Sequence, residues 1–166
     1  DLRVYLLAAL SGFSTLALQG LYFRVFSRTL QNSTYTFAAV LAVFLLSLSL
    51  GSARVGRMVR SMGPLRVVGV SSLIGAVLVP ASMLLFTGMT HLGQLDPGDG
   101  FIRYMFIVFG LSIVVVAPAA SCFGAILPAL WLHMEARGIG FAVGRLTALN
   151  TLAAAAGSFL VGFFFL

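Results

Sequence analysis

Five long runs of the chain contain no charged residue, and these runs constrain the fold more than any other feature. Each approaches or exceeds the ~20 apolar residues that a helix needs to cross the hydrocarbon of a bilayer. An open sheet is excluded there, because its edge amides would lack hydrogen-bond partners. The sequence therefore predicts one domain, residues 1–166, folded as an all-α, polytopic transmembrane bundle of about five membrane-spanning helices, at residues 4–23, 34–52, 67–90, 104–132 and 146–166.

The composition agrees with a membrane protein. Hydrophobic residues make up 60% of the 166 residues, charged residues only 8%, and the mean hydropathy is +1.09. A soluble domain carries about 25% charged residues, because its surface must face water. A soluble globule, a disordered segment and a nucleic-acid-binding domain are therefore poor interpretations, although the pI is near 10.8.

The fourth run is too long for one straight span. Residues 104–134 would form a helix of roughly 46 Å, at about 1.5 Å per residue, whereas the hydrocarbon is only about 30 Å thick. Pro118 and Pro128 each remove a backbone donor from this run. We expect a kink or break near residues 116–119.

The arginines predict the orientation. All ten basic residues are Arg, and the net charge is +6. With five spans, the N-terminus and the loops at residues 54–66 and 135–145 share one side, and the loop at residues 93–100 lies on the other. Because positive residues are retained on the cytoplasmic side, we expect a cytoplasmic N-terminus in a bacterial inner membrane. The side with the N-terminus holds seven arginines: Arg3, Arg54, Arg57, Arg60, Arg66, Arg137 and Arg145.

Small residues four positions apart predict where helices approach closely. Such pairs let backbones touch, which matters in lipid because no hydrophobic drive brings apolar helices together. The candidate packing positions are Gly12, Gly75, Gly157 and Gly162.

Few residues could carry chemistry inside the membrane. The four acids, Asp1, Asp96, Asp99 and Glu135, lie in loops or at the terminus, so the usual intramembrane proton relay is absent. The single cysteine, Cys122, excludes an internal disulfide and a Cys-based metal site. We expect no metal, no cofactor and no catalytic residues in this chain.

Four polar residues within or beside the spans are the candidate site: Gln19, Arg24, Tyr35 and Asn150. Burying a polar group in hydrocarbon costs free energy unless it is paired. These side chains either contact a substrate in a cavity or bridge helices, at about 0.6 kcal/mol per interhelical hydrogen bond. Arg24 has a third possibility, which is to extend toward the interface.

The stretch from residue 51 to 60 is the most patterned. Gly51 and Gly56 permit a tight turn after the second span, and Arg54, Arg57 and Arg60 are expected to contact helix carbonyls or lipid phosphates. The stretch resembles the loop between the second and third helices of major facilitator transporters, without the acidic residue of that motif.

Several segments, in order along the chain, together resemble one family. They read SGF at 11–13, LQ at 18–19 before Arg24, STY at 33–35, LGS at 50–52, GAILP at 124–128 and VGRLTALNTL at 143–152. The chain resembles the membrane domain of bacterial spermidine-synthase-like membrane proteins, also described as fused major-facilitator/spermidine synthase proteins. It differs from them at Leu18 and Thr147, where tyrosine is common in the family.

The resemblance implies a bundle like one half of a major facilitator transporter. In that family a soluble aminopropyltransferase-like domain often follows the helices, but its Gly-rich nucleotide loop and acidic residues are absent from this sequence. Three functions follow as hypotheses. The favoured one is a scaffold or accessory subunit of a larger membrane complex, with the bilayer and other membrane subunits as partners and no nucleic acid. The alternatives are a transporter half for a small solute, such as an amine, and a membrane anchor for an aminopropyltransferase-like enzyme.

Overall fold

The apolar runs form long helices in the computed structural model, which describes residues 2–30, 33–91, 100–136 and 140–164. Every regular element in these ranges is an α-helix, so the predicted all-α bundle is confirmed. Five helices are long and apolar enough to cross a membrane, and the chain is therefore a multi-pass membrane protein. The elements are α1 (Leu2–Thr29), α2 (Thr34–Met62), α3 (Pro64–Thr90), α4 (Phe101–Val115), α5 (Ala117–Gly124), α6 (Ile126–Glu135) and α7 (Gly140–Phe164). The predicted loop at residues 93–100 lies outside the described residues, except for Gly100.

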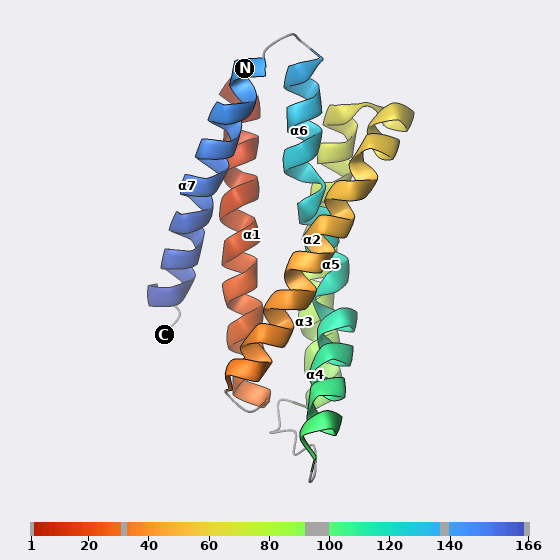
Figure 1. Ribbon diagram of the computed structural model, residues 1–166, viewed down its shortest axis with the longest axis vertical. Helices are drawn as coiled ribbons and strands as arrows, with labels where there is room; N and C mark the ends of the chain where they lie inside the picture. The colour runs from red at the N-terminus through yellow and green to blue at the C-terminus, as the bar shows by residue number, and fades with distance from the viewer. Residues whose placement is uncertain (1, 31–32, 92–99, 137–139, 165–166) are drawn as a thin grey trace.

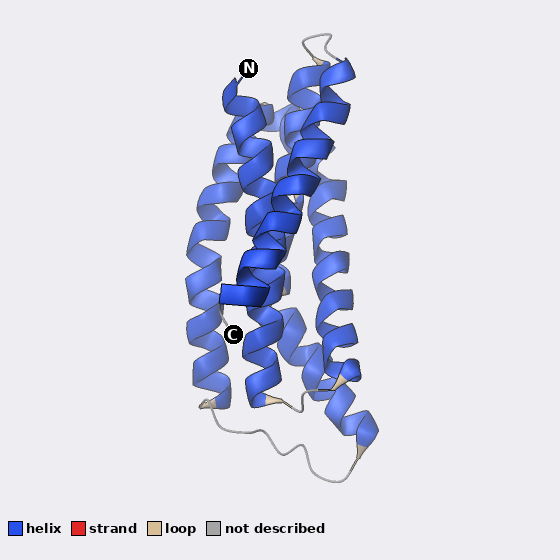
Figure 2. Ribbon diagram, turned by 90° about the vertical axis from the view of Figure 1, so that its left-hand side faces the viewer, coloured by secondary structure: helices blue, strands red, loops and turns tan. Residues whose placement is uncertain are grey.

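The long helices run in alternate directions along the molecule (Figures 1 and 2). The first turns of α1 and α7 and the junction between α2 and α3 lie at one end, and the start of α2 lies at the other (Figure 1). α7 packs mainly against α1, whereas α2 and α3 pack against α5. The bundle is thus built from an α1–α7 pair beside a group formed by the other helices.

The break predicted near residues 116–119 is confirmed. α4 ends at Val115, and Pro118 is the second residue of α5. A second break at Ala125 places Pro128 in the first turn of α6. A proline is tolerated in the first turn of a helix because the amide it lacks would have no partner there. α4, α5 and α6 consequently follow one another along the bundle as one interrupted segment (Figure 1).

The prediction of a loop from residue 54 to 66 is wrong. α2 continues to Met62, so the predicted turn at Gly51 and Gly56 lies inside a helix. No proline precedes residue 64, and Arg, Met and Ala are good helix formers even outside the bilayer. The helix ends only at Gly63, whose φ of 83° suits glycine, and Pro64 then begins α3. Arg54, Arg57 and Arg60 are exposed side chains on the last turns of α2.

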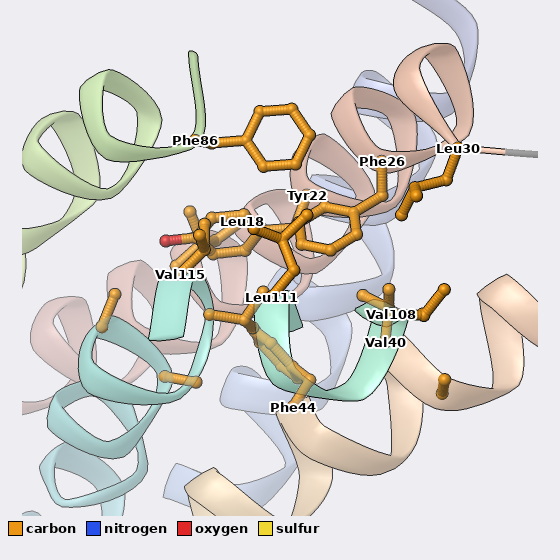
Figure 3. Close-up of a cluster of buried hydrophobic side chains, with 14 of the residues drawn as sticks. Leu18, Tyr22, Phe26, Leu30, Val40, Phe44, Phe86, Val108, Leu111 and Val115 are labelled. Atoms are coloured by element: carbon orange, nitrogen blue, oxygen red, sulfur yellow. The ribbon is translucent and has the colours of Figure 1, made fainter. Parts of the chain in front are cut away.

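A cluster of buried aromatic and branched side chains holds α1 against α2, α3 and α4 (Figure 3). Phe26 of α1 packs on Phe86 of α3, with ring centroids 4.9 Å apart. The Tyr22 hydroxyl is also buried here, and it is hydrogen-bonded to the Ser82 hydroxyl at 2.7 Å. A buried polar group would be costly without such a partner. This cluster fixes α1, which carries two of the four predicted site residues.

Candidate functional site

Two glycines lock α1 against α7. A Cβ atom at Gly12 would lie 2.0 Å from the backbone carbonyl oxygen of Asn150, and one at Gly157 would lie 2.4 Å from the carbonyl oxygen of Phe13. Each of the two helices thus has a glycine in contact with a backbone carbonyl group of the other helix. No side chain can be accommodated at either position without moving a backbone.

The same reciprocal arrangement joins α2 to α5. A Cβ atom at Gly51 would lie 2.0 Å from the carbonyl oxygen of Ser121, and one at Gly124 would lie 2.2 Å from that of Leu48. Gly51 therefore allows the close contact between α2 and α5 and does not form a turn. Backbones this close place Cα hydrogens against carbonyl oxygens, a weak attraction that recurs at helix–helix interfaces.

The other two predicted packing glycines differ from each other. A Cβ atom at Gly75 of α3 would lie 3.1 Å from the Phe123 ring, so this glycine also faces a neighbour. A Cβ atom at Gly162 of α7 would have nothing within 4 Å among the described residues. Gly162 is exposed in the chain as described.

A cavity of about 590 Å³, here called the central cavity, lies between the α1–α7 pair and α2, α5 and α6. Its volume is in the range of small-molecule sites. Most of its wall is apolar, including Leu16, Leu48, Phe123 and Leu127. The predicted residue Asn150 lines it.

Trp131 also lines the central cavity, and the sequence did not single it out as a site residue. Its indole Nε1 is buried and has no hydrogen-bond partner among the described residues. A buried N–H group usually finds an acceptor. A tryptophan near the end of a span is typical of the membrane interface. Because that role is common, the sequence alone does not indicate that Trp131 lines a cavity.

A second cavity of about 550 Å³, here called the Arg24 pocket, lies along the same side of α1. It brings together Gln19 and Arg24, two residues predicted from the sequence. Leu16 belongs to the walls of both cavities, so the two follow each other along one groove. The α1 and α7 residues of the pocket are Leu16, Gln19, Gly20, Phe23, Arg24, Ser27, Ser158, Val161 and Gly162, and Phe37 comes from α2.

The four predicted site residues are therefore divided among three places. Gln19 and Arg24 share a pocket, and Asn150 lies in the adjoining cavity. Among the described residues, neither Gln19 nor Asn150 has a side-chain hydrogen bond to another helix. Tyr35 is 59% exposed, and its ring stands edge-on to Phe101, with centroids 5.0 Å apart.

α7 separates its residues by size. A row of small side chains, here called the small-residue face, follows the helix at alternating spacings of four and three and is exposed along its whole length. Large apolar side chains, including Leu152, Phe159 and Phe163, are exposed along the adjoining stripe of the helix. The small-residue face consists of Gly144, Ala148, Thr151, Ala155, Ser158 and Gly162.

The described residues contain no group of three or more His, Cys, Asp or Glu side chains that could hold a metal ion. No family model, no curated protein and no solved structure matches the chain in comparisons with known proteins.

Proposed function

We propose that the chain is an integral scaffold or accessory subunit of a larger complex in the bacterial cytoplasmic membrane. In this proposal the part of the small-residue face from Gly144 to Ala155 receives a transmembrane helix of a partner subunit, whereas Ser158 and Gly162 line the Arg24 pocket. The observation that carries it is the exposed row of small residues from Gly144 to Ala155.

Lipid tails cover large and small apolar side chains equally well, so solvation by lipid does not require such a row. Close helix packing does, because small residues let backbones approach. Within this molecule, small residues mark the contacts between α1 and α7 and between α2 and α5. The same residue type on α7 has no helix against it among the described residues, although α7 is held to the bundle mainly through α1.

Substitution of Ala148 by leucine tests this proposal. The added bulk is expected to hold a partner helix away from α7, and the larger assembly should be lost on native gels of mildly solubilised membranes. Ala76→Leu is the matched control, because Ala76 is an exposed alanine on α3. An assembly that survives Ala148→Leu as well as Ala76→Leu counts against the small-residue face as the contact.

A transporter half is the second candidate, and the central cavity favours it. The segments that carry the family resemblance supply much of this wall, including Gly12, Gly124, Leu127, Pro128 and Asn150. Transporters bind their substrates near the bilayer midplane, between helices. The described residues of the cavity wall include no carboxylate, so the cavity suits a neutral or amphipathic solute better than a polyamine. The role of enzyme anchor stays a prediction.

Solute flux assays distinguish the transporter function from the scaffold function. For a transporter, proteoliposomes are expected to accumulate a labelled solute at a rate that falls at least tenfold in Asn150→Ala, because the variant removes the amide that lines the cavity. Thr87→Ala on α3 supplies the control, since the exposed Thr87 hydroxyl donates a hydrogen bond within its own helix, to the carbonyl of Leu84. Wild-type vesicles no faster than empty ones across a panel of neutral and amine solutes would remove the transporter candidate.

A further inference from the structure

We propose that the Arg24 pocket binds a phosphate group, and that this phosphate belongs to an anionic phospholipid. The guanidinium of Arg24 borders this pocket. Its Nη1 atom is buried and has no hydrogen-bond partner among the described residues. The Arg24 side chain as a whole is half-buried. A buried N–H group without a partner is costly, and an oxyanion in the adjoining pocket removes that cost.

The described chain offers no carboxylate to fill this role. Glu135 is the only acidic residue in the described ranges, and it ends α6. The end of α6 lies beside the first turn of α1, at the opposite end of the bundle from Arg24 (Figure 1). Among the described residues, no carboxylate is therefore placed to pair with Arg24.

The depth of Arg24 places it near lipid phosphates. α1 has 28 residues, which correspond to about 42 Å at ~1.5 Å per residue, about 12 Å more than the hydrocarbon thickness. If α1 is centred in the bilayer, about 6 Å of helix extends beyond the hydrocarbon at each end. Arg24 precedes the last residue, Thr29, by five positions, or about 7.5 Å. Its backbone thus lies at the boundary where headgroups begin.

The rest of the pocket suits the two parts of a phospholipid. Gln19 and Ser158 line the pocket and add an amide and a hydroxyl group that can donate hydrogen bonds to phosphate oxygens. Phe23 and Phe37 stand edge-to-face in its wall, with ring centroids 4.7 Å apart. Those rings, with Val161, form an apolar surface for the start of an acyl chain. Arginine is well suited to the polar part, because its planar fork bonds two phosphate oxygens at once.

Thermal unfolding of the purified full chain in a neutral, phosphate-free detergent tests the proposal. Dioleoylphosphatidylglycerol is expected to raise the Tm of the wild type by several degrees, because a ligand that binds only the folded state stabilises it. The gain should be absent in Arg24→Gln and retained in Arg28→Gln, which removes an exposed arginine one turn away. Dioleoylglycerol, which has the same acyl chains and no phosphate, should give the wild type no comparable gain.

Two further measurements identify the source of the phosphate and keep the proposal testable if the Arg24 variant misfolds. A rise in Tm with inorganic phosphate but none with phosphatidylglycerol would overturn the lipid assignment, as would equal gains in wild type and Arg24→Gln. If Arg24→Gln does not fold, Gln19→Leu is used in its place. The phosphatidylglycerol concentration that gives half of the maximal rise in Tm should be severalfold higher for Gln19→Leu than for the wild type, and an unchanged concentration would contradict the proposal.

Discussion

Alanine at Gly12 is expected to separate α1 from α7 and to cause one of the largest losses of stability that a single methyl group can cause in this chain. The new Cβ would lie 2.0 Å from the carbonyl oxygen of Asn150. A backbone carbonyl cannot move aside by changing rotamer, so the helices must shift. Overpacking typically costs about 1–3 kcal/mol, and this clash belongs at or above the top of that range.

Trp131, the only tryptophan in the chain, reports the change because it lines the central cavity, as Gly12 does. Its fluorescence during unfolding in a denaturing detergent gives the loss of stability. Gly162→Ala is the control, because no atom of another described helix lies within 4 Å of its added methyl group. That variant should be neutral or more stable by up to about 1 kcal/mol, since alanine is the better helix former. Equal losses in the two variants would contradict the close contact.

The contact between α2 and α5 predicts a second large effect, with a signature in the double variant. Gly51→Ala and Gly124→Ala should each cost about 2–3 kcal/mol, because each methyl group meets a carbonyl oxygen at 2.0–2.2 Å. Once one methyl group has moved the helices apart, the second finds more space. The double variant should therefore cost clearly less than the sum of the two single variants.

Gly110→Ala provides the control for this cycle, since a Cβ at Gly110 of α4 would have no atom of another helix within 4 Å in the described part of the chain. It should combine additively with Gly51→Ala. Additive costs for Gly51→Ala with Gly124→Ala would instead mean that the two glycines do not share one interface. The measurement is again the fluorescence-detected unfolding free energy.

The helices could be predicted from the sequence because apolar length alone determines which segments can cross a bilayer. Pro118 likewise predicted the break in the fourth run, since a missing amide is a local property. The end of α2 was mispredicted because charge was treated as the end of the helix. Arginine leaves the hydrocarbon without leaving the helix, and α2 ends only where Gly63 adopts a positive φ.

The site was less predictable, because spacing shows that a helix can pack closely but does not identify its neighbour. Gly51 looked like a turn residue until Ser121 of a distant segment was placed against it. Gln19 and Arg24 flank one stripe of α1, which Leu16, Gly20, Phe23 and Ser27 follow at spacings of three and four. Asn150 and Trp131 meet at one cavity only through the packing of α7 beside α1 and α6.

The small-residue face of α7 follows a spacing that is visible in the sequence, but its significance comes from exposure. Gly157 and Ala148 belong to the same helix and are both small. Gly157 is covered by α1, whereas Ala148 is exposed. Only the folded arrangement distinguishes a contact already made within the chain from one left for another helix.

Cysteine cross-linking in native membranes tests the partner helix most directly. The background is Cys122→Ser, which removes the single native cysteine, and the probes are Ala148→Cys on the small-residue face and Ala76→Cys at an exposed position of α3. With a short thiol-to-amine or photoactivatable reagent, Ala148→Cys should shift most of the chain to one defined, larger species, and Ala76→Cys should not. Labelling of both positions by lipid-soluble thiol reagents, without a cross-linked species from Ala148→Cys, would show that lipid covers this face and would contradict the proposed role as a subunit.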